Sequence, residues 1–350
     1  MHIRWILQTD DRFKSETWCS DEEFLRSVQN YIDLINSKLE EVTVNYPTFL
    51  ELPLRYVIKA GGKRLRPLLA LLSCSAVCGD PKPAIPVAVA YEFAHTAALI
   101  QDDIIDKGIR RRGKLSAWAL WGTEKAVLIS DILIFEIFHR LAEYERLSLP
   151  QERLYLLLRL IGDSARRTVQ GEFLELELSG KEKVTEEDYL TIIRLKTGAL
   201  LAASAAAGAI AGGGSTSEVS AIHEFAEKIG MAYQIYDDIL DVSGNPERLG
   251  KPVFVDIRNR KRNLLVIYAL NNGSEEESKF IRSLLGKRKL EEWEFEKAKE
   301  IFEKTGSVDA AKKLSFKFAE EGRSCLKALK PSQAKDQLIE LSYLVSKRYA

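Results

Sequence analysis

Apolar residues recur every three or four positions along most of this chain, which is the spacing of helices that bury one face. Phe24, Val28 and Ile35 illustrate the pattern near its beginning. No stretch shows the sustained alternation of apolar and polar residues that is typical of half-buried strands. The chain is therefore predicted to be all-α, with helices over residues 21–39, 49–58, 68–77, 85–106, 125–144, 151–178, 185–212 and 218–242 and several more after residue 263.

Breaks rich in glycine and proline separate these segments without dividing the chain into two parts. Gly61 and Gly62 end one apolar segment, and Pro67 is expected to be the first residue of the next helix. Residues 107–114 are predicted to form a basic loop, and residues 244–261 a second loop. Because no low-complexity linker interrupts the pattern, residues 21–350 are predicted to be a single domain, preceded by an N-terminal extension of residues 1–20.

Composition places the chain among soluble globular proteins. Of its 350 residues 46% are hydrophobic and 29% are charged, with 51 basic and 51 acidic side chains. A balanced net charge gives no indication of nucleic acid as a partner. The most apolar stretch, residues 198–212, is rich in alanine and shorter than a membrane span requires, so no segment is expected to cross a membrane.

The cysteines indicate a reducing compartment. Four cysteines are too few for a disulfide framework at this length, and no His or Cys cluster beside them completes a zinc site. They are predicted to be reduced thiols in a cytoplasmic protein. These residues are Cys19, Cys74, Cys78 and Cys325.

One acidic motif, Asp-Asp-x-x-Asp, occurs twice, each time at the end of an apolar helical segment. The first and last aspartates of a copy lie one helical turn apart on the same face. Carboxylates in apolar surroundings are costly without partners, and Mg²⁺ prefers oxygen ligands from one or two carboxylates together with substrate phosphates. Two copies facing each other would clamp a diphosphate through bridging ions, whereas a single copy could equally be a solvated helix end. The two copies are Asp102, Asp103 and Asp106, and Asp237, Asp238 and Asp241.

Basic residues gather at the predicted helix ends and loops near these motifs. Arginine suits bidentate contact with phosphate, and lysine supplies a point charge. Their grouping predicts two anion sites, one bridged by metal and one held directly by basic side chains. His95 lies seven residues before Asp102, on nearly the same helical side, and is predicted to face the same site. The basic residues are Lys63, Arg64, Arg66, Arg110, Arg111, Arg112, Lys196, Lys251 and Lys261.

These residues together resemble the trans-isoprenyl diphosphate synthases, also called polyprenyl synthetases. The resemblance rests on residues 61–67, both aspartate motifs, Arg111-Arg112-Gly113, Lys196-Thr197 and residues 250–252, in the order of the family. It implies an all-α bundle in one domain around a deep central cavity, with three magnesium ions and usually a homodimer. It also implies an activity that joins isopentenyl diphosphate to an allylic diphosphate, head to tail and in trans.

The resemblance implies a role for each matching residue. Asp102, Asp106 and Asp237 would bind magnesium directly, and the other three aspartates would act through water or as secondary ligands. Lys63, Arg66, His95 and Arg112 would hold the diphosphate of isopentenyl diphosphate. The allylic diphosphate would be held by Arg111, Lys196 and Lys251, with Thr197, Gln234 and Lys261 beside it.

Four positions depart from the family pattern. Gln101 stands where many members have His, and Glu175 replaces a usual Asp. Phe254 occupies a position that is commonly Gly, and residues 260–263 lack the usual Gly and Thr around Lys261. The last two departures concern the closing loop and the role of Lys261, whereas the aspartates of both motifs are intact.

Product length is predicted from small residues near the first motif. Ala97 and Ala98 would leave room for a growing chain if they line the cavity, and Tyr91, Phe135 and Phe138 could form a floor below them. These aromatic residues could equally be ordinary core. A C20 product, geranylgeranyl diphosphate, is favoured over C15 or longer products. A class I terpene cyclase and a non-catalytic regulatory subunit of a synthase are the alternatives considered.

Overall fold

Helices of three to eight turns dominate the computed structural model, as predicted. The structure describes residues 21–43, 46–179, 181, 183–243, 253–287 and 289–346. The predicted N-terminal extension, residues 1–20, lies outside them. The first ten elements are α1 (Asp21–Thr43), α2 (Thr48–Ile58), α3 (Leu65–Cys78), η3 (Lys82–Ala84), α4 (Ile85–Ile105), β1 (Arg110–Arg111), β2 (Lys114–Leu115), α5 (Ala117–Trp121), α6 (Thr123–Ala142) and η4 (Glu143–Glu145).

The second half of the chain is also helical. A capping box begins helix α8 at Thr185, because the Thr185 hydroxyl accepts from the Asp188 backbone and the Asp188 carboxylate accepts from the Thr185 backbone. The elements are α7 (Gln151–Ser179), α8 (Glu186–Ile193), η5 (Arg194–Gly198), α9 (Ala199–Ala211), α10 (Thr216–Ser243), α12 (Val255–Arg258), α13 (Leu264–Asn272), α14 (Glu275–Leu284), α15 (Glu292–Lys304), α16 (Ser307–Cys325), η6 (Leu326–Ala328) and α17 (Gln333–Ser346).

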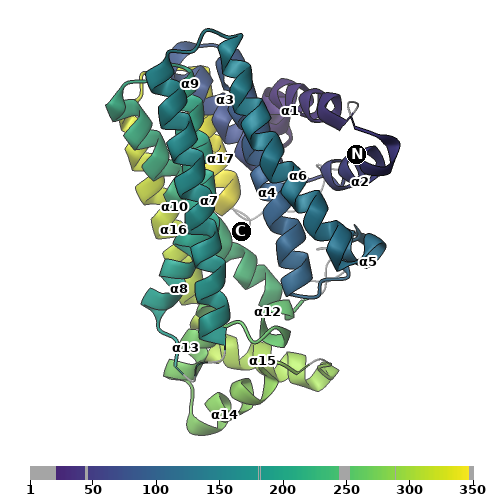
Figure 1. Ribbon diagram of the computed structural model, residues 1–350. Coiled ribbons are helices and arrows are strands. Elements are labelled where there is room, and N and C mark those ends of the chain that lie inside the picture. The colour runs from purple at the N-terminus through teal and green to yellow at the C-terminus, as the bar shows by residue number, and fades with distance from the viewer. Residues whose placement is uncertain are drawn as a thin grey trace.

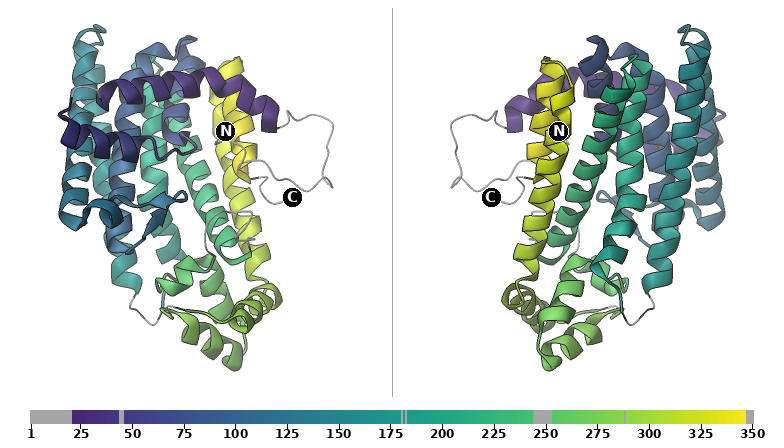
Figure 2. Two further views of the ribbon diagram at one scale, coloured as in Figure 1. Left: turned by 90° about the vertical axis from the view of Figure 1, so that its right-hand side faces the viewer. Right: turned by 90° about the vertical axis from the view of Figure 1, so that its left-hand side faces the viewer.

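The long helices run side by side and enclose α9, every residue of which is buried (Figure 1). Helix α3 packs against α9, α4 against α6, and α10 against both α9 and α16. Gly208 permits the close approach of α3 and α9, since a Cβ there would overlap the carbonyl oxygen of Ala70. Helix α1 lies across one end of this bundle, and α12 to α15 gather at the other (Figure 2).

Three expectations from the sequence differ from the structure. The basic segment after α4 is not wholly loop, because Arg110 and Arg111 pair with Leu115 and Lys114 in a short antiparallel ribbon. Within the second predicted loop, the described residues include the one-turn helix α12. Helix α3 also begins at Leu65, two residues before the expected Pro67.

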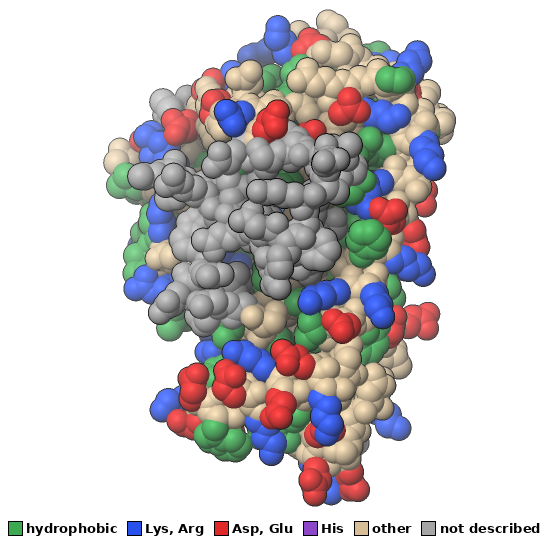
Figure 3. Space-filling view, turned by 180° about the vertical axis from the view of Figure 1, so that it is seen from behind, with side chains coloured by type: hydrophobic (Ala, Val, Ile, Leu, Met, Phe, Trp, Pro, Cys, Tyr) green, Lys and Arg blue, Asp and Glu red, His purple; other side chains and the backbone are tan. Residues whose placement is uncertain are grey.

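Two apolar helical segments, residues 82–105 and 186–211, have the length and composition of a membrane span. Their most apolar windows are 61% and 67% buried within the chain, so both are explained as core helices. On the face opposite to that of Figure 1, acidic and basic side chains of the described residues are interspersed (Figure 3).

Candidate active site

The first aspartate motif lies at the C-terminal end of α4, as predicted. Asp103 is buried, and its carboxylate accepts two hydrogen bonds from Arg111, at 3.0 Å from Nε and 2.7 Å from Nη2. Asp106 follows the last residue of the helix, and its carboxylate lies 3.1 Å from Nζ of Lys261. Among the described residues, nothing forms a hydrogen bond or ion pair with the side chain of Asp102. Burial raises the pKa of Asp102, and the charges of Lys196, Lys261 and Arg111 oppose that rise.

The second motif lies at the C-terminal end of α10, where two of its aspartates are held tightly. Asp238 is buried and accepts from the Tyr189 hydroxyl at 2.7 Å and from Nε2 of Gln234 at 2.9 Å. Thr197 donates to Oε1 of the same glutamine at 2.9 Å. The buried carboxylate of Asp241 accepts hydrogen bonds from the backbone of α12.

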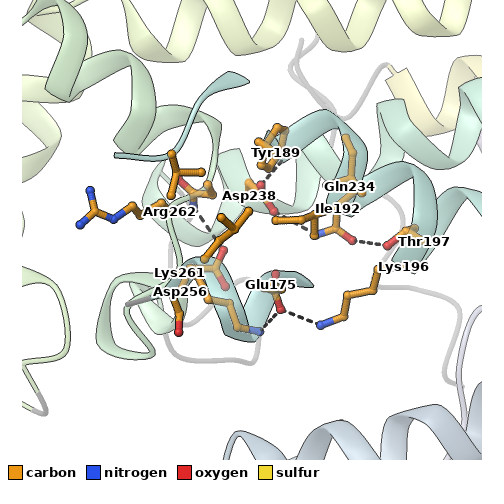
Figure 4. A pocket seen from close by; sticks show the side chains of 15 residues that line it. Glu175, Tyr189, Ile192, Lys196, Thr197, Gln234, Asp238, Asp256, Lys261 and Arg262 are labelled. Carbon is orange, nitrogen blue, oxygen red and sulfur yellow. Dashed lines mark hydrogen bonds and ion pairs between the residues drawn. The ribbon is translucent and has the colours of Figure 1, made fainter. Parts of the chain in front are cut away.

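Two lysines, Lys196 and Lys261, converge on the carboxylate of Glu175 in α7 (Figure 4). Lys196 forms ion pairs with Glu172 and Glu175 of α7. Lys261 lies 3.3 Å from Glu175 and 3.1 Å from Asp106, so Glu175 contacts both lysines. Burial alone would lower the pKa of Lys196 and of Lys261, but the surrounding carboxylates, Glu175 foremost, raise both above the usual range. Both lysines are therefore charged.

A π-helical turn, η5, presents Lys196 and Thr197 to this site. Turns of this kind are rare and frequently mark functional positions. The turn packs closely on α7 at Gly171, where a Cβ would lie 2.6 Å from the backbone nitrogen of Lys196. Gly198 and Gly230 similarly allow the turn to approach α10. Glycine at these positions therefore brings α7 and α10 together around the lysine.

The space beside these residues is a pocket of about 90 Å³ between α7, α8, η5, α10 and the segment after α12. Its polar side chains include those already described, with Ser179, Asp256, Arg262 and Asn263 in addition. Burial raises the pKa of both Asp238 and Asp256, and the rise is reinforced by the charge of Asp256 at Asp238 and by the charge of Glu175 at Asp256. The pocket is therefore lined by acidic and basic groups drawn from distant parts of the sequence.

A second basic cluster forms where the N-terminus of α3 meets α4 and the β-ribbon. A Cβ on Gly62 would lie 2.5 Å from Nη1 of Arg112. The absence of a side chain at Gly62 therefore allows the guanidinium of Arg112 to pack against the glycine turn. Lys63 donates to the Tyr233 hydroxyl of α10 at 3.0 Å and lies 4.9 Å from the centre of its ring. This contact connects the cluster to the helix that carries the second motif.

His95 and Arg66 belong to this cluster. Burial lowers the pKa of His95 well below its usual value, and the charges of Arg66 and Arg112 lower it further. Burial also lowers the pKa of Arg66 to about 10, against the opposing charge of Glu92. The histidine is therefore neutral at physiological pH and can donate one hydrogen bond to an anion without adding charge.

Arg64 lies next to this cluster, but its side chain is buried beneath the surface. It is buried and forms an ion pair with the buried Glu92, and its guanidinium also donates to the carbonyl of Ile58 at 2.8 Å and to Asn36 at 3.1 Å. The pair therefore ties α1, α2, α3 and α4 together beneath Lys63 and Arg66.

Several residues of the site were not predicted. The basic residues could be recognised because they occur in short polar segments at helix ends. The unpredicted residues lie within helices, and nothing in the surrounding sequence marked them as neighbours of the aspartate motifs. They come from α4, α7, α8, α10 and α12: Glu92, Glu172, Tyr189, Tyr233 and Asp256.

Lys251, predicted to hold the allylic diphosphate, lies outside the described residues.

The residues predicted to set product length differ in their exposure. Tyr91 and Ala97 are buried, and Ala98 is partly exposed on the face of α4 that carries Asp102 one turn later. Phe135 and Phe138 are 64% and 56% exposed. They cannot form the floor of a cavity within the single chain, since their side chains point away from its interior.

The residues at the two motifs fit a hard divalent cation. Within the described part of the chain, no three His, Cys, Asp or Glu side chains already converge as a metal site. The oxygen donors are divided between α4 and α10, which suits an ion that keeps several waters and uses few carboxylates. Asp102 is partly buried, and its carboxylate has no hydrogen bond or ion pair with the described residues, so a bound cation would offset the cost of its desolvation.

Comparison with known proteins identifies close relatives. A family model described as polyprenyl synthetase matches residues 47–302. A short chain isoprenyl diphosphate synthase of Methanothermobacter thermautotrophicus is 36% identical over 93% of this chain and 99% of the relative. The crystal structure of geranylgeranyl pyrophosphate synthetase from Pyrococcus horikoshii matches with a TM-score of 0.87 at 33% identity, covering 93% of this chain and 98% of the other. A polyprenyl synthase from Caulobacter crescentus, complexed with calcium and isoprenyl diphosphate, matches with a TM-score of 0.85 at 28% identity, covering 96% and 100%.

Proposed function

Because this chain belongs to the polyprenyl synthetase family, we propose that it is a magnesium-dependent synthase that condenses isopentenyl diphosphate with an allylic diphosphate, head to tail. The observation that carries this proposal is the placement of Lys261 between the two halves of the site. The ammonium of Lys261 lies 3.1 Å from Asp106 of the first motif. Two residues later, Asn263 donates a hydrogen bond to Asp256, whose charge acts on Asp238 of the second motif. One diphosphate could therefore be held from both sides.

The six aspartates are proposed to have two different roles. Asp103, Asp238 and Asp241 hold side chains or backbone of the site in place. Asp102, Asp106 and Asp237 are the proposed ligands of three magnesium ions, the same three that the resemblance implies. When bound, these ions would neutralise the negative charge that develops on the allylic diphosphate as its C–O bond breaks.

The remaining groups of the site position the two substrates. Lys196 and Lys261, with Arg111, Thr197 and Gln234 beside them, would hold the allylic diphosphate. Donors fixed in a site of low dielectric stabilise developing charge more than water does. Lys63, Arg66, His95 and Arg112 would hold the diphosphate of isopentenyl diphosphate, so that its double bond faces the allylic carbon from which diphosphate departs and forms the new C–C bond there. Released diphosphate would accept the proton that is lost in the final step.

Product analysis tests this proposal. Purified protein with Mg²⁺, isopentenyl diphosphate and farnesyl diphosphate is expected to release inorganic diphosphate and to form a longer prenyl diphosphate, and EDTA should abolish both signals. Products are separated by chain length. A folded protein that turns over no allylic starter would contradict the proposal and favour a non-catalytic regulatory subunit.

The favoured product is geranylgeranyl diphosphate, with 20 carbons. Along the face of α4 below Asp102, Ala98 and Ala94 are small and partly exposed, and the buried Tyr91 follows one turn further. Small side chains next to the metal site leave space for a growing chain, and the tyrosine ring would limit it. The solved relative from Pyrococcus horikoshii bears the name of a geranylgeranyl pyrophosphate synthetase.

Ala98→Phe is expected to shorten the main product from 20 to 15 carbons, because the new ring would fill the wall one turn below Asp102. Ala97 is the matched control. It is 2% exposed, so Ala97→Phe overpacks the core and is expected to lower the melting temperature without a specific change in product. Products are separated by reversed-phase chromatography after dephosphorylation. An unchanged distribution of product chain lengths in Ala98→Phe would show that Ala98 does not line the cavity.

We also propose that the enzyme is a cytoplasmic homodimer. Helices α6 and α7 expose large apolar side chains that a single chain leaves uncovered, and exposed patches of this kind mark association surfaces. These side chains are Val127, Leu128, Phe135, Phe138, Tyr155, Leu156, Val169 and Phe173.

A further inference from the structure

The third aspartate of the second motif holds the short helix α12. The carboxylate of Asp241 accepts from the backbone of Val255 at 3.0 Å and of Asp256 at 3.2 Å, and its own carbonyl accepts from the backbone of Phe254 at 2.7 Å. A carboxylate at the first turn of a helix satisfies N–H groups that have no partner within it. Both carboxylate oxygens are therefore engaged with the backbone.

Phe254 fixes the other side of the same helix. It has φ +58°, in the left-handed region where a residue other than Gly is costly, and its side chain is completely buried. Its ring packs edge-on against Phe295 of α15, with centroids 5.0 Å apart, and also contacts Phe302. Burial of the aromatic ring offsets the strained backbone. The departure from glycine at this position thus anchors α12 to α15.

The anchored helix determines where Lys261 lies. The backbone of Lys261 donates to the carbonyl of Asp256 at 2.8 Å, and Nδ2 of Asn263 donates to the Asp256 carboxylate at 3.2 Å. From this turn the lysine reaches Asp106 and Glu175. Asp241 is therefore connected to Lys261 through the backbone of a single helical turn.

We propose that Asp241 is a positioning residue, which aims Lys261 at the diphosphate by holding α12, and is not a magnesium ligand. This inference rests on the proposed function. It separates Asp241 from Asp237, which lies one turn earlier on the same helix. The role follows from the two backbone hydrogen bonds, because each carboxylate oxygen uses a lone pair on an N–H of α12 and the orientation of the carboxylate is set by that helix.

The test compares two variants at Asp241 with one at Asp237, one at Phe254 and a control at an exposed position. Asp241→Asn keeps one acceptor, and Mn²⁺ binding in the presence of inorganic diphosphate is expected to stay within about twofold of wild type, whereas Asp237→Asn should abolish it. Asp241→Ala is expected to raise the KM for the allylic diphosphate about tenfold with little change in kcat, because Lys261 is displaced. Phe254→Ala should reproduce this pattern, and Phe49→Ala, at an exposed position, should not.

Hydrogen exchange keeps the inference separate from the proposed function. Backbone amides of Val255 and Asp256 should exchange faster in Asp241→Ala than in wild type, whether or not the protein turns over substrate. Loss of Mn²⁺ binding in Asp241→Asn equal to that in Asp237→Asn would overturn the proposal, as would unchanged exchange at these two amides. If the wild type neither binds Mn²⁺ nor forms product, the proposed function fails and exchange alone decides whether Asp241 anchors α12.

Discussion

Asp102→Asn is expected to lower kcat roughly 10²–10³-fold and yet to leave the fold at least as stable as wild type. The amide keeps the shape of the side chain but cannot supply an anionic ligand to magnesium. Because burial raises the pKa of Asp102, its ionised form disfavours the folded state, and the stability that its protonated form provides is lost as the pH rises through the raised pKa. The neutral asparagine avoids that loss at pH 7.

Steady-state kinetics and thermal melting at several pH values measure both effects. The stability gained by Asp102→Asn should disappear below about pH 4, where the wild-type carboxyl is itself protonated. Asp163→Asn, on the exposed face of α7, is the matched control and should change neither quantity. Activity of Asp102→Asn within a few-fold of wild type would show that Asp102 is not a ligand of the metal.

Arg64→Met is expected to destabilise the protein by about 3–5 kcal/mol, because it leaves Glu92 as an unpaired charge in the core. Both side chains of the pair are at most 8% exposed. The same change should raise the KM for isopentenyl diphosphate, because the pair supports the turn that carries Lys63 and Arg66. Urea denaturation, followed by circular dichroism, gives the stability change.

An exposed ion pair provides the comparison. Arg166 and Asp163 lie 3.2 Å apart on the surface of α7, and Arg166→Met is expected to cost less than about 1 kcal/mol. The double variant Arg64→Met/Glu92→Leu should recover a large part of the loss, since it removes the unpaired charge. A cost below about 1 kcal/mol for Arg64→Met alone would show that the buried pair is not a main support of this cluster.

The helices could be predicted because burial of one face imposes its spacing on the sequence. Helix α4 was expected at residues 85–106 and spans Ile85–Ile105. The ribbon at Arg110 and Arg111 could not be predicted, since two-residue strands have no periodicity. The π-turn at Lys196 was also missed, because its formation depends on the close approach of Gly171.

Residue identity alone marked the aspartates and the basic side chains, but their pairing depends on tertiary structure. Glu175 was noted only as a departure, and it joins Lys196 to Lys261. Phe254 raised doubt about the closing loop, and its buried ring supplies the anchor that glycine would lack. Phe135 and Phe138 were misplaced because helical spacing does not indicate which apolar residues lie inside the chain and which are exposed on its surface.

The central claim is that the two aspartate motifs act together on one diphosphate. Mn²⁺ binding, followed by electron paramagnetic resonance with and without inorganic diphosphate, tests it most directly. Tight binding is expected only when diphosphate is present, and either Asp102→Asn or Asp237→Asn alone should abolish it. Binding that survives the loss of one motif, or that does not depend on diphosphate, would contradict a shared site.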